Sequence, residues 1–328
     1  MKAKITFEAE KCVECPYCKN NYCTTAKRET PKNIPDWCPF VLQQYLVFLL
    51  ALDDDPNWKS CMEANTSNPW NLPELAFDRG LNHAIKTAHF AKHFIHDLAD
   101  HSFKDFLYGE ECHSVERDQY LMTIAAMIRD VGEHDPNIAK EGRLDKFSYL
   151  KESEFCAEDK DIISDAVLHW NEVDNLIEDF DMMKEIAKVH RRKPTLDTGT
   201  AIKISLLLGS MLDVGPGRVT RSTYEVHTNR DRLMIGNEIR PLALALKKIE
   251  KVEFKLVYND HYGKVAGPNP KNAAELHYTV ADEFNVSDLK LWPELIQTPR
   301  RIAEEFLGLK SFKFFVNDKQ VNIRRVTG

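Results

Sequence analysis

The sequence predicts a mainly α-helical protein with three parts: a small N-terminal cysteine-rich module, a central all-helical domain and a small C-terminal α/β unit. Five of the eight cysteines fall within residues 12–38. Between residues 74 and 230, apolar residues recur at spacings of three and four, which is the pattern of helices with one buried face. After residue 231, several segments instead alternate apolar and polar residues, which is typical of half-buried strands.

Composition and charge narrow the class of protein. The chain has 328 residues, too many for one small core, so two or three units are expected. Apolar residues make up 43% and charged residues 29%, as in ordinary globular proteins, and the net charge of −7 argues against a general nucleic-acid binder. There is no run of eighteen apolar residues and no apolar core of a signal peptide at the N-terminus. We therefore expect a cytoplasmic protein with no membrane partner.

The cysteine-rich segment is predicted to bind metal. Cys12 and Cys15 form a C-x2-C pair, a spacing that directs two thiolates at one ion, and Cys18, Cys23 and Cys38 follow. In a cytosolic chain, such crowding indicates metal binding rather than disulfides. Four thiolates complete a tetrahedral zinc site, and a segment this short needs such a clamp to fold.

The same segment resembles small cysteine-rich modules of the form C-x2-C-P…C…I-P-x-W-C-P, which are taken to hold zinc or iron. This resemblance implies Cys12, Cys15, Cys23 and Cys38 as the ligands and leaves Cys18 spare. One alternative is an iron–sulfur cluster, because C-x2-C-x2-C-x4-C followed by a remote Cys-Pro is near the bacterial ferredoxin spacing, with x4 in place of x3. The other alternative is that these cysteines are free thiols. The strongly apolar segment after Cys38 is predicted to be a helix that docks this module on the rest of the chain.

Turn and breaker residues divide the chain into segments. Asp53-Asp-Asp-Pro-Asn and Asn65-Thr-Ser-Asn-Pro indicate a linker between the first helix and the central domain. The predicted segments are the cysteine module with its docking helix at 1–52, the linker at 53–73, the helical domain at 74–230 and the α/β domain at 231–328.

Helices of the central domain follow from the apolar periodicity. They are predicted at about 74–100, 115–130, 158–171, 175–190 and 201–213. The last of them, Ala201–Asp213, is apolar all round, so it should be central and buried, and it stops at the breaker cluster Val214-Gly-Pro-Gly217.

The C-terminal unit is predicted to combine helices and strands. A helix near 238–250 leads into a strand at Val252, and a second strand begins at Glu275. A helix across 293–308 precedes a third strand at Ser311, after which the turn Asn317-Asp-Lys begins one more. This unit carries no chemical motif.

Four segments of the central domain share a family resemblance. They are Arg79-x3-His83, Ala126-Met-Ile-Arg129-Asp130-Val-Gly132, Asp161-Ile-Ile-Ser-Asp-Ala-Val-Leu-His169 and Leu206-Leu-Leu-Gly-Ser210-Met-Leu-Asp213-Val-Gly-Pro-Gly-Arg218. Together they resemble the HD-domain superfamily of metal-dependent phosphohydrolases, over roughly residues 74–225, about half of the chain. In that family, a histidine on an early helix, a His-Asp pair ending a second helix and an aspartate on a late buried helix hold a divalent metal ion.

The resemblance implies a set of ligands from which this chain departs at two positions. His83 and Asp130 stand at ligand positions, but Arg129 replaces the paired histidine, and a guanidinium is no metal ligand at neutral pH. Ser210 stands at the place of the late aspartate, with Asp213 three residues later. The remaining candidate ligands are Asp213 together with His134 or His169, and the candidate phosphate-binding residues are Arg191, Arg192 and Arg218.

A divalent ion in such a site activates water and neutralises phosphoryl charge. Under this interpretation manganese, magnesium, iron or zinc is the expected ion, and Asp130, Arg129 and Arg218 are the residues nearest to the chemistry. The competing interpretation keeps the scaffold without the metal. Arg129 then forms an internal ion pair or an anion-binding pocket with Asp130. Three further histidines, at 89, 93 and 96, are predicted to form a solvated polar face, because no carboxylate or cysteine completes a metal site with them.

Three functions follow from these interpretations. The first is a regulatory or anion/nucleotide-binding module with a degenerate metal site. The second is an active phosphohydrolase acting on a nucleotide or other phosphoester. The third is a nucleic-acid-binding protein that uses the cysteine module, which the acidic balance makes the least favoured. The expected partner is a phosphorylated small molecule or nucleotide, and an oligomer is compatible with all three.

Overall fold

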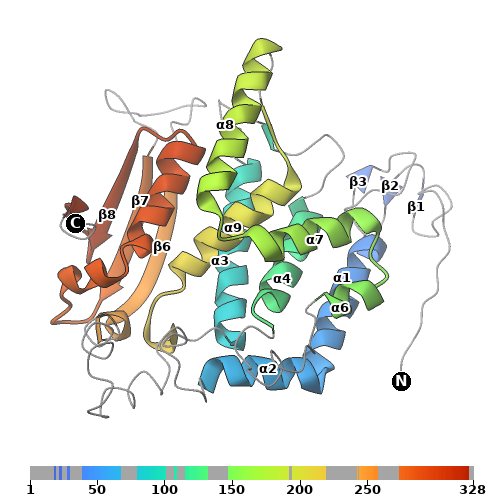
Figure 1. The fold of residues 1–328 in the computed structure, drawn as a ribbon, viewed down its shortest axis with the longest axis horizontal. Coiled ribbons are helices and arrows are strands. Elements are labelled where there is room, and N and C mark those ends of the chain that lie inside the picture. The colour runs from blue at the N-terminus through green and yellow to red at the C-terminus, as the bar shows by residue number, and fades with distance from the viewer. Residues whose placement is uncertain are drawn as a thin grey trace.

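Helix α9 (Thr198–Leu212) lies at the centre of the molecule, and the other elements pack around it (Figure 1). The computed structural model describes residues 18–19, 22–23, 28–29, 39–67, 80–100, 107–108, 115–131, 147–191, 194–218, 242, 244–257 and 273–324. Nearly every side chain of α9 is buried, as its unbroken apolar run predicts. Asp197 caps its first turn by accepting hydrogen bonds from the backbone N–H and the hydroxyl of Thr200.

The helical body confirms the prediction of a mainly helical chain. Its elements are α1 (Pro39–Asp54), α2 (Pro56–Ser67), α3 (Leu81–Asp100), α4 (Val115–Arg129), α6 (Ser148–Glu152), α7 (Ala157–His169) and α8 (Val173–Val189). A short parallel bridge joins β4 (Leu107–Tyr108) to β5 (Thr195–Leu196). Helices α3, α4 and α7 all pack against α9.

The closest approach in the body is between α3 and α9, and it depends on Gly209. A Cβ at this position would lie 2.4 Å from the carbonyl oxygen of Thr87 and 3.2 Å from Ala91. A side chain here would therefore push the two helices apart. Since α3 carries His83 and α9 ends beside Asp213, this contact sets the spacing of the site described below.

One predicted feature of the body is wrong. The sequence predicts a linker over 53–73, but Pro56–Ser67 form α2, whose Trp58, Cys61 and Met62 are buried in the core. Asp55 accepts hydrogen bonds from the backbone N–H groups of Asn57 and Trp58, and proline suits the first turn of a helix. The same residues that indicate a turn thus also start a helix.

A four-stranded sheet packs on one side of the helical body (Figure 1). Its order is β6 (Ile249–Val257), β7 (Ala273–Val280), β8 (Ser311–Val316) and β9 (Lys319–Val321). The β6–β7 and β8–β9 pairs are antiparallel and β7–β8 is parallel. The parallel pair is joined through the 3-10 helix η6 (Val286–Leu291), α12 (Glu294–Arg301) and a π-helical turn at Ile302–Phe306.

The predicted strands and the turn into a fourth are confirmed. The helix predicted near 238–250 is present at residues 242 and 244–247 and ends before β6 begins at Ile249. The sheet is not separate from the helices, because one hydrophobic core includes side chains of α3, α8, α9, β6, β7, β8 and α12. The boundary predicted at residue 230 lies outside the described residues.

Little of the cysteine module is described. Backbone strands β1 (Cys18–Lys19), β2 (Tyr22–Cys23) and β3 (Arg28–Glu29) form a small antiparallel sheet in which Cys18 is opposite Cys23. The predicted ligands Cys12, Cys15 and Cys38 lie outside the described residues, so the metal site of this module stays a prediction. The predicted docking helix exists as α1, which buries Tyr45 and Leu52.

Candidate functional site

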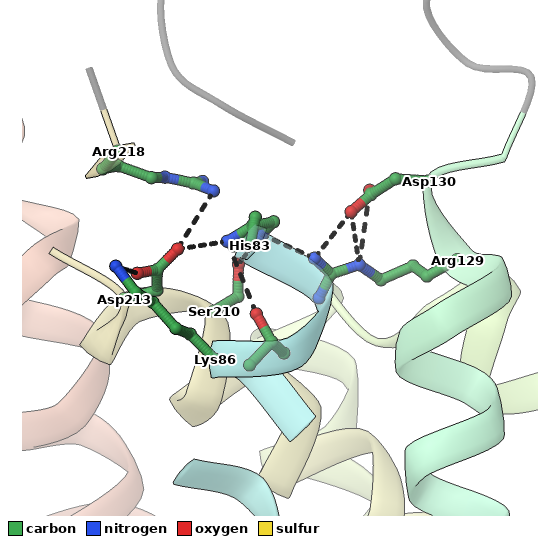
Figure 2. A network of polar contacts seen from close by, with 8 residues as sticks. His83, Lys86, Arg129, Asp130, Ser210, Asp213 and Arg218 are labelled. Atoms are coloured by element: carbon green, nitrogen blue, oxygen red, sulfur yellow. Dashed lines mark hydrogen bonds and ion pairs between the residues drawn. The ribbon is translucent and has the colours of Figure 1, made fainter. Parts of the chain in front are cut away.

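The residues singled out by the sequence meet where the first turns of α3, the end of α4 and the end of α9 come together (Figure 2). His83 lies on α3. Arg129 is the last residue of α4, and Asp130 follows it. Asp213 directly follows the last residue of α9. The short 3-10 helix η3 (Pro216–Arg218) adds Arg218. All five side chains are buried.

His83 is held from both sides of its ring. Nη2 of Arg129 lies 2.7 Å from its Nε2, and Oδ2 of Asp213 lies 2.7 Å from its Nδ1. A guanidinium only donates hydrogen bonds, so Nε2 must accept, and the ring proton must sit on Nδ1 and be donated to Asp213. This pattern defines a neutral imidazole of one tautomer, and its orientation is fixed by charged neighbours on both sides.

Arg129 contacts Asp130 and Trp170 in addition to His83. Nη2 also donates to Oδ2 of Asp130 at 2.8 Å, and Nε lies 3.3 Å from both oxygens of that carboxylate. The guanidinium carbon lies 4.2 Å from the centroid of the Trp170 ring, a cation–π distance. The side chain therefore bridges the imidazole of His83 and the carboxylate of Asp130 through a single nitrogen.

Asp213 lies close to the two other cations of the cluster, Lys86 and Arg218. Its Oδ1 lies 3.3 Å from Nζ of Lys86, and its Oδ2 lies 3.7 Å from Nη1 of Arg218. Ser210 lies at the limit of hydrogen bonding, with Oγ 3.5 Å from Nε2 of His83. The side chain of Lys86 is 44% exposed and Gly217 is exposed, so this end of the cluster opens to the surface.

The described members of the cluster carry one more positive than negative charge. Among its described members, Lys86, Arg129 and Arg218 contribute three positive charges, whereas Asp130 and Asp213 contribute two negative charges. The neutral imidazole adds none. The excess lies within a chain whose net charge is −7, so it is a local feature of this site.

The described residues of this cluster do not fit a metal ion. The ring nitrogen and the carboxylate that would bind it both contact the guanidinium of Arg129 instead. Among the described residues, no group of three or more His, Cys, Asp or Glu side chains is arranged to hold a metal. Arg129 takes the position between two potential ligands, and a positive charge is supplied there without an ion.

Other predicted residues lie elsewhere. His169 is partly exposed, and its ring faces Glu172 at 3.1 Å and Asp165 at 3.8 Å rather than the cluster. Arg191 is exposed at the end of α8. His134 and Arg192 lie outside the described residues, as do most of the cysteines named above.

Two members of the cluster were not predicted. Lys86 is one helical turn after His83 on α3, so the spacing of i and i+3 could have placed it on the same face. Trp170 follows His169 directly, but nothing in its sequence position indicates a contact with Arg129, because that contact depends on how α7 packs on α4.

The predicted histidine face on α3 is exposed, as expected for a solvated polar surface. The rings of His89 and His93 lie edge to face with centroids 4.6 Å apart. Partial burial lowers the pKa of His89, and the nearby His93 and Lys92 lower it further.

A second buried network was also not predicted. Arg117 donates to Oδ1 of Asp159 through Nη2 at 2.6 Å and Nε at 3.1 Å, and the Tyr45 hydroxyl donates to Oδ2 at 2.6 Å. Burial, followed by the carboxylate of Asp159, raises the pKa of Tyr45. These contacts join α1, α4 and α7, so the network is a clamp between helices.

In comparisons with known proteins, no family model, no curated protein and no solved structure matches this chain. Among the described helices, none combines the length and apolarity that crossing a membrane requires.

Proposed function

We propose that this chain is a divergent HD-domain protein that acts as a regulatory module and binds a phosphorylated small molecule or nucleotide without a metal ion at the His83–Asp130 position. The observation that carries the proposal is the guanidinium of Arg129, which lies 2.7 Å from Nε2 of His83 and 2.8 Å from Oδ2 of Asp130. A fixed guanidinium there supplies one positive charge where a divalent ion would supply two, and it cannot activate a water molecule as a metal ion does.

The entrance to the site supports an anionic ligand. The side chain of Lys86 is 44% exposed, and the buried side chain of Arg218 on η3 approaches the same carboxylate, that of Asp213. Both share the carboxylate of Asp213, so a phosphate oxygen can take over part of that contact and form charge-assisted hydrogen bonds to the two cations. The ligand is expected to bind at this surface, with Arg129 and His83 forming the rigid base beneath it.

Calorimetric titration of the metal-free full chain with pyrophosphate, ADP and ATP tests this proposal. Loss of one charge-assisted hydrogen bond costs about 1.5–3 kcal/mol, so Lys86→Gln should weaken binding by roughly 10- to 150-fold. Lys319→Gln removes an exposed lysine on β9, outside the cluster, and is the matched control, expected to bind like wild type. Equal binding by wild type and Lys86→Gln would contradict the proposal.

Measurements of manganese binding and phosphate release on the same protein distinguish a metal-free binding module from a phosphohydrolase. Manganese-supplemented wild type should neither bind a manganese ion at His83 nor release phosphate from the ligands. Arg129→His supplies a second imidazole beside His83 and Asp130, so this variant should gain manganese binding that His83→Ala abolishes. A manganese ion bound by wild type and lost in His83→Ala, together with turnover, would support the hydrolase instead.

The cysteine module is tested independently. We expect about one zinc per chain on elemental analysis, which is the stoichiometry of a single four-thiolate site. Cys15→Ser should remove this zinc without changing pyrophosphate binding. If the purified protein is brown and absorbs near 400 nm, the module holds an iron–sulfur cluster instead of zinc.

A further inference from the structure

Helix α8 has an exposed apolar face in addition to its buried one. Leu176, Ile177, Phe180 and Ala187 face the core, where the Phe180 ring lies 4.6 Å from that of Phe306. On the opposite side, Met182 is 60% exposed, Ile186 47% and Val189 78%. These three residues, the α8 stripe, are spaced at i, i+4 and i+7 and so form one continuous line along the helix. Figure 1 shows the last turns of α8 extending beyond the other labelled helices.

Single exposed apolar residues are common on protein surfaces, but a row of three on a projecting helix is a feature of interaction surfaces. The exposed apolar residues on α3 and α7, Ile85 and Leu168, are single, and the group on α1, Leu46, Val47 and Leu50, lies on the helix predicted to dock the cysteine module. The α8 stripe leaves three large side chains in water on one helix face, so burying them favours association by the hydrophobic effect.

The charges along α8 indicate which partner fits. Its first half is acidic: Glu178 and Asp179 are exposed and lie within one turn of Met182. Its end is basic, since His190 and Arg191 are exposed next to Val189 and the sequence continues with Arg192-Lys193. Other acids of this helix already have partners, because Asp181 pairs with Lys184 and Glu185 with Lys188.

When two copies of α8 lie antiparallel, the acidic half of each helix faces the basic end of the other. With a two-fold axis at Ile186 and a rise of 1.5 Å per residue, Asp179 lies about 10 Å along the helix on one side of the axis. Val189, the last helical residue of the other copy, lies about 5 Å along on that same side. Arg191 follows two residues later in the turn after the helix, where its φ is 53°, and its long side chain can reach from there towards Asp179. A parallel pair would place acid beside acid, and an anionic lipid surface would be repelled by Glu178 and Asp179.

We propose that two copies of this chain associate through α8 in an antiparallel, two-fold symmetric pair. The α8 stripes pack against each other at the centre, and Asp179 of each copy faces Arg191 of the other. This inference does not depend on the function proposed for the His83 site.

Sedimentation velocity of the full chain at about 1 to 300 µM tests the pair, because interfaces of this small size associate weakly. We expect a concentration-dependent shift from 37.8 kDa towards twice that mass. Ile186→Asp should raise the dissociation constant at least about tenfold, since it places a charge at the centre of the interface. Leu168→Asp changes a residue that is 53% exposed on α7 and is the matched control, expected to dimerise like wild type. A chain that stays monomeric throughout, or a dimer unaffected by Ile186→Asp, would overturn the proposal and leave the stripe to a different partner.

Charge reversal tests the antiparallel order. Asp179→Arg and Arg191→Asp should each weaken self-association, because each creates two like-charge contacts per dimer. An equimolar mixture of the two variants should dimerise at least as well as wild type, since one chain then carries arginine and the other aspartate at both positions. If mixing restores no association, the antiparallel arrangement is wrong.

Discussion

At the scale of the residue, Arg129 shows how a buried charge is made tolerable. It is 1% exposed, yet its guanidinium contacts a carboxylate, an imidazole and an indole ring. Taking a charge out of water costs several kcal/mol, which such contacts offset only when they are all present. Arg129 therefore stabilises the folded state only while these partners are present.

Arg129→Met should remove the charge and keep much of the side-chain length. The carboxylate of Asp130 would then be buried without its main partner, at a cost of about 3–5 kcal/mol in unfolding free energy. Urea denaturation followed by circular dichroism measures this change. Arg301→Met is the comparison, because Arg301 pairs with Asp174 at the surface and should lose no more than about 1 kcal/mol. A loss below that level for Arg129→Met would show that Asp130 does not depend on it.

Glu275 gives a pH-dependent prediction at the same scale. Burial alone would raise the pKa of its carboxyl group, but hydrogen bonds from His277 and Lys313 outweigh burial and lower the pKa below 4.5. The stabilisation is therefore present above pH 4.5 and is lost as the pH falls through the folded-state pKa. Glu275→Gln should lower the melting temperature at pH 7, and the difference from wild type should shrink as the pH falls from about 6 to 3. An unchanged difference across that range would contradict the assignment.

At the scale of the element, the contact of α3 with α9 is the most sensitive to substitution. Gly209→Ala would place a Cβ 2.4 Å from the backbone oxygen of Thr87, which cannot move without moving α3. We expect a loss of about 1–3 kcal/mol, or more, together with weaker pyrophosphate binding, because His83 lies one turn before Thr87 on α3. In Gly217→Ala the new Cβ would meet only the mobile end of Lys86 at 3.1 Å, so its stability should stay near wild type. Equal stability of the two variants would contradict the tight contact.

Sequence patterns predicted most elements and part of the site. The apolar run of α9 predicts a buried central helix, and the family resemblance predicts that His83, Asp130 and Asp213 belong to one site. The linker prediction failed because Asp55-Pro56 is suited both to a turn and to a helix start. The Arg117–Asp159 pair could not be predicted, since residues 42 positions apart meet only through the packing of α4 on α7.

At the scale of the whole molecule, the shared core makes the sheet and the helical body mutually dependent. Side chains of α8 and α9 pack in the same cluster as those of β7, β8 and the π-helical turn. Neither side could keep its apolar surface covered alone, so they should unfold in one transition.

Phe306→Ala tests this dependence. The ring packs on Phe180 of α8, and its removal should cost about 3–5 kcal/mol. Hydrogen exchange followed by mass spectrometry should show the slowest amides of α9 and of β7 losing protection by the same free energy. Loss of protection in β7 with α9 unchanged would show two independently stable units.

The cation between His83 and Asp130 is part of the polypeptide, and this has a consequence for the cell. A metal ion equilibrates with its surroundings, so a metal site is empty when supply is short and takes the wrong ion when another is abundant. Arg129 is instead part of every chain that is synthesised, one per site, and no chelator removes it. The base of this site is therefore complete in every folded copy, whether the cell is starved of transition metals or overloaded with them.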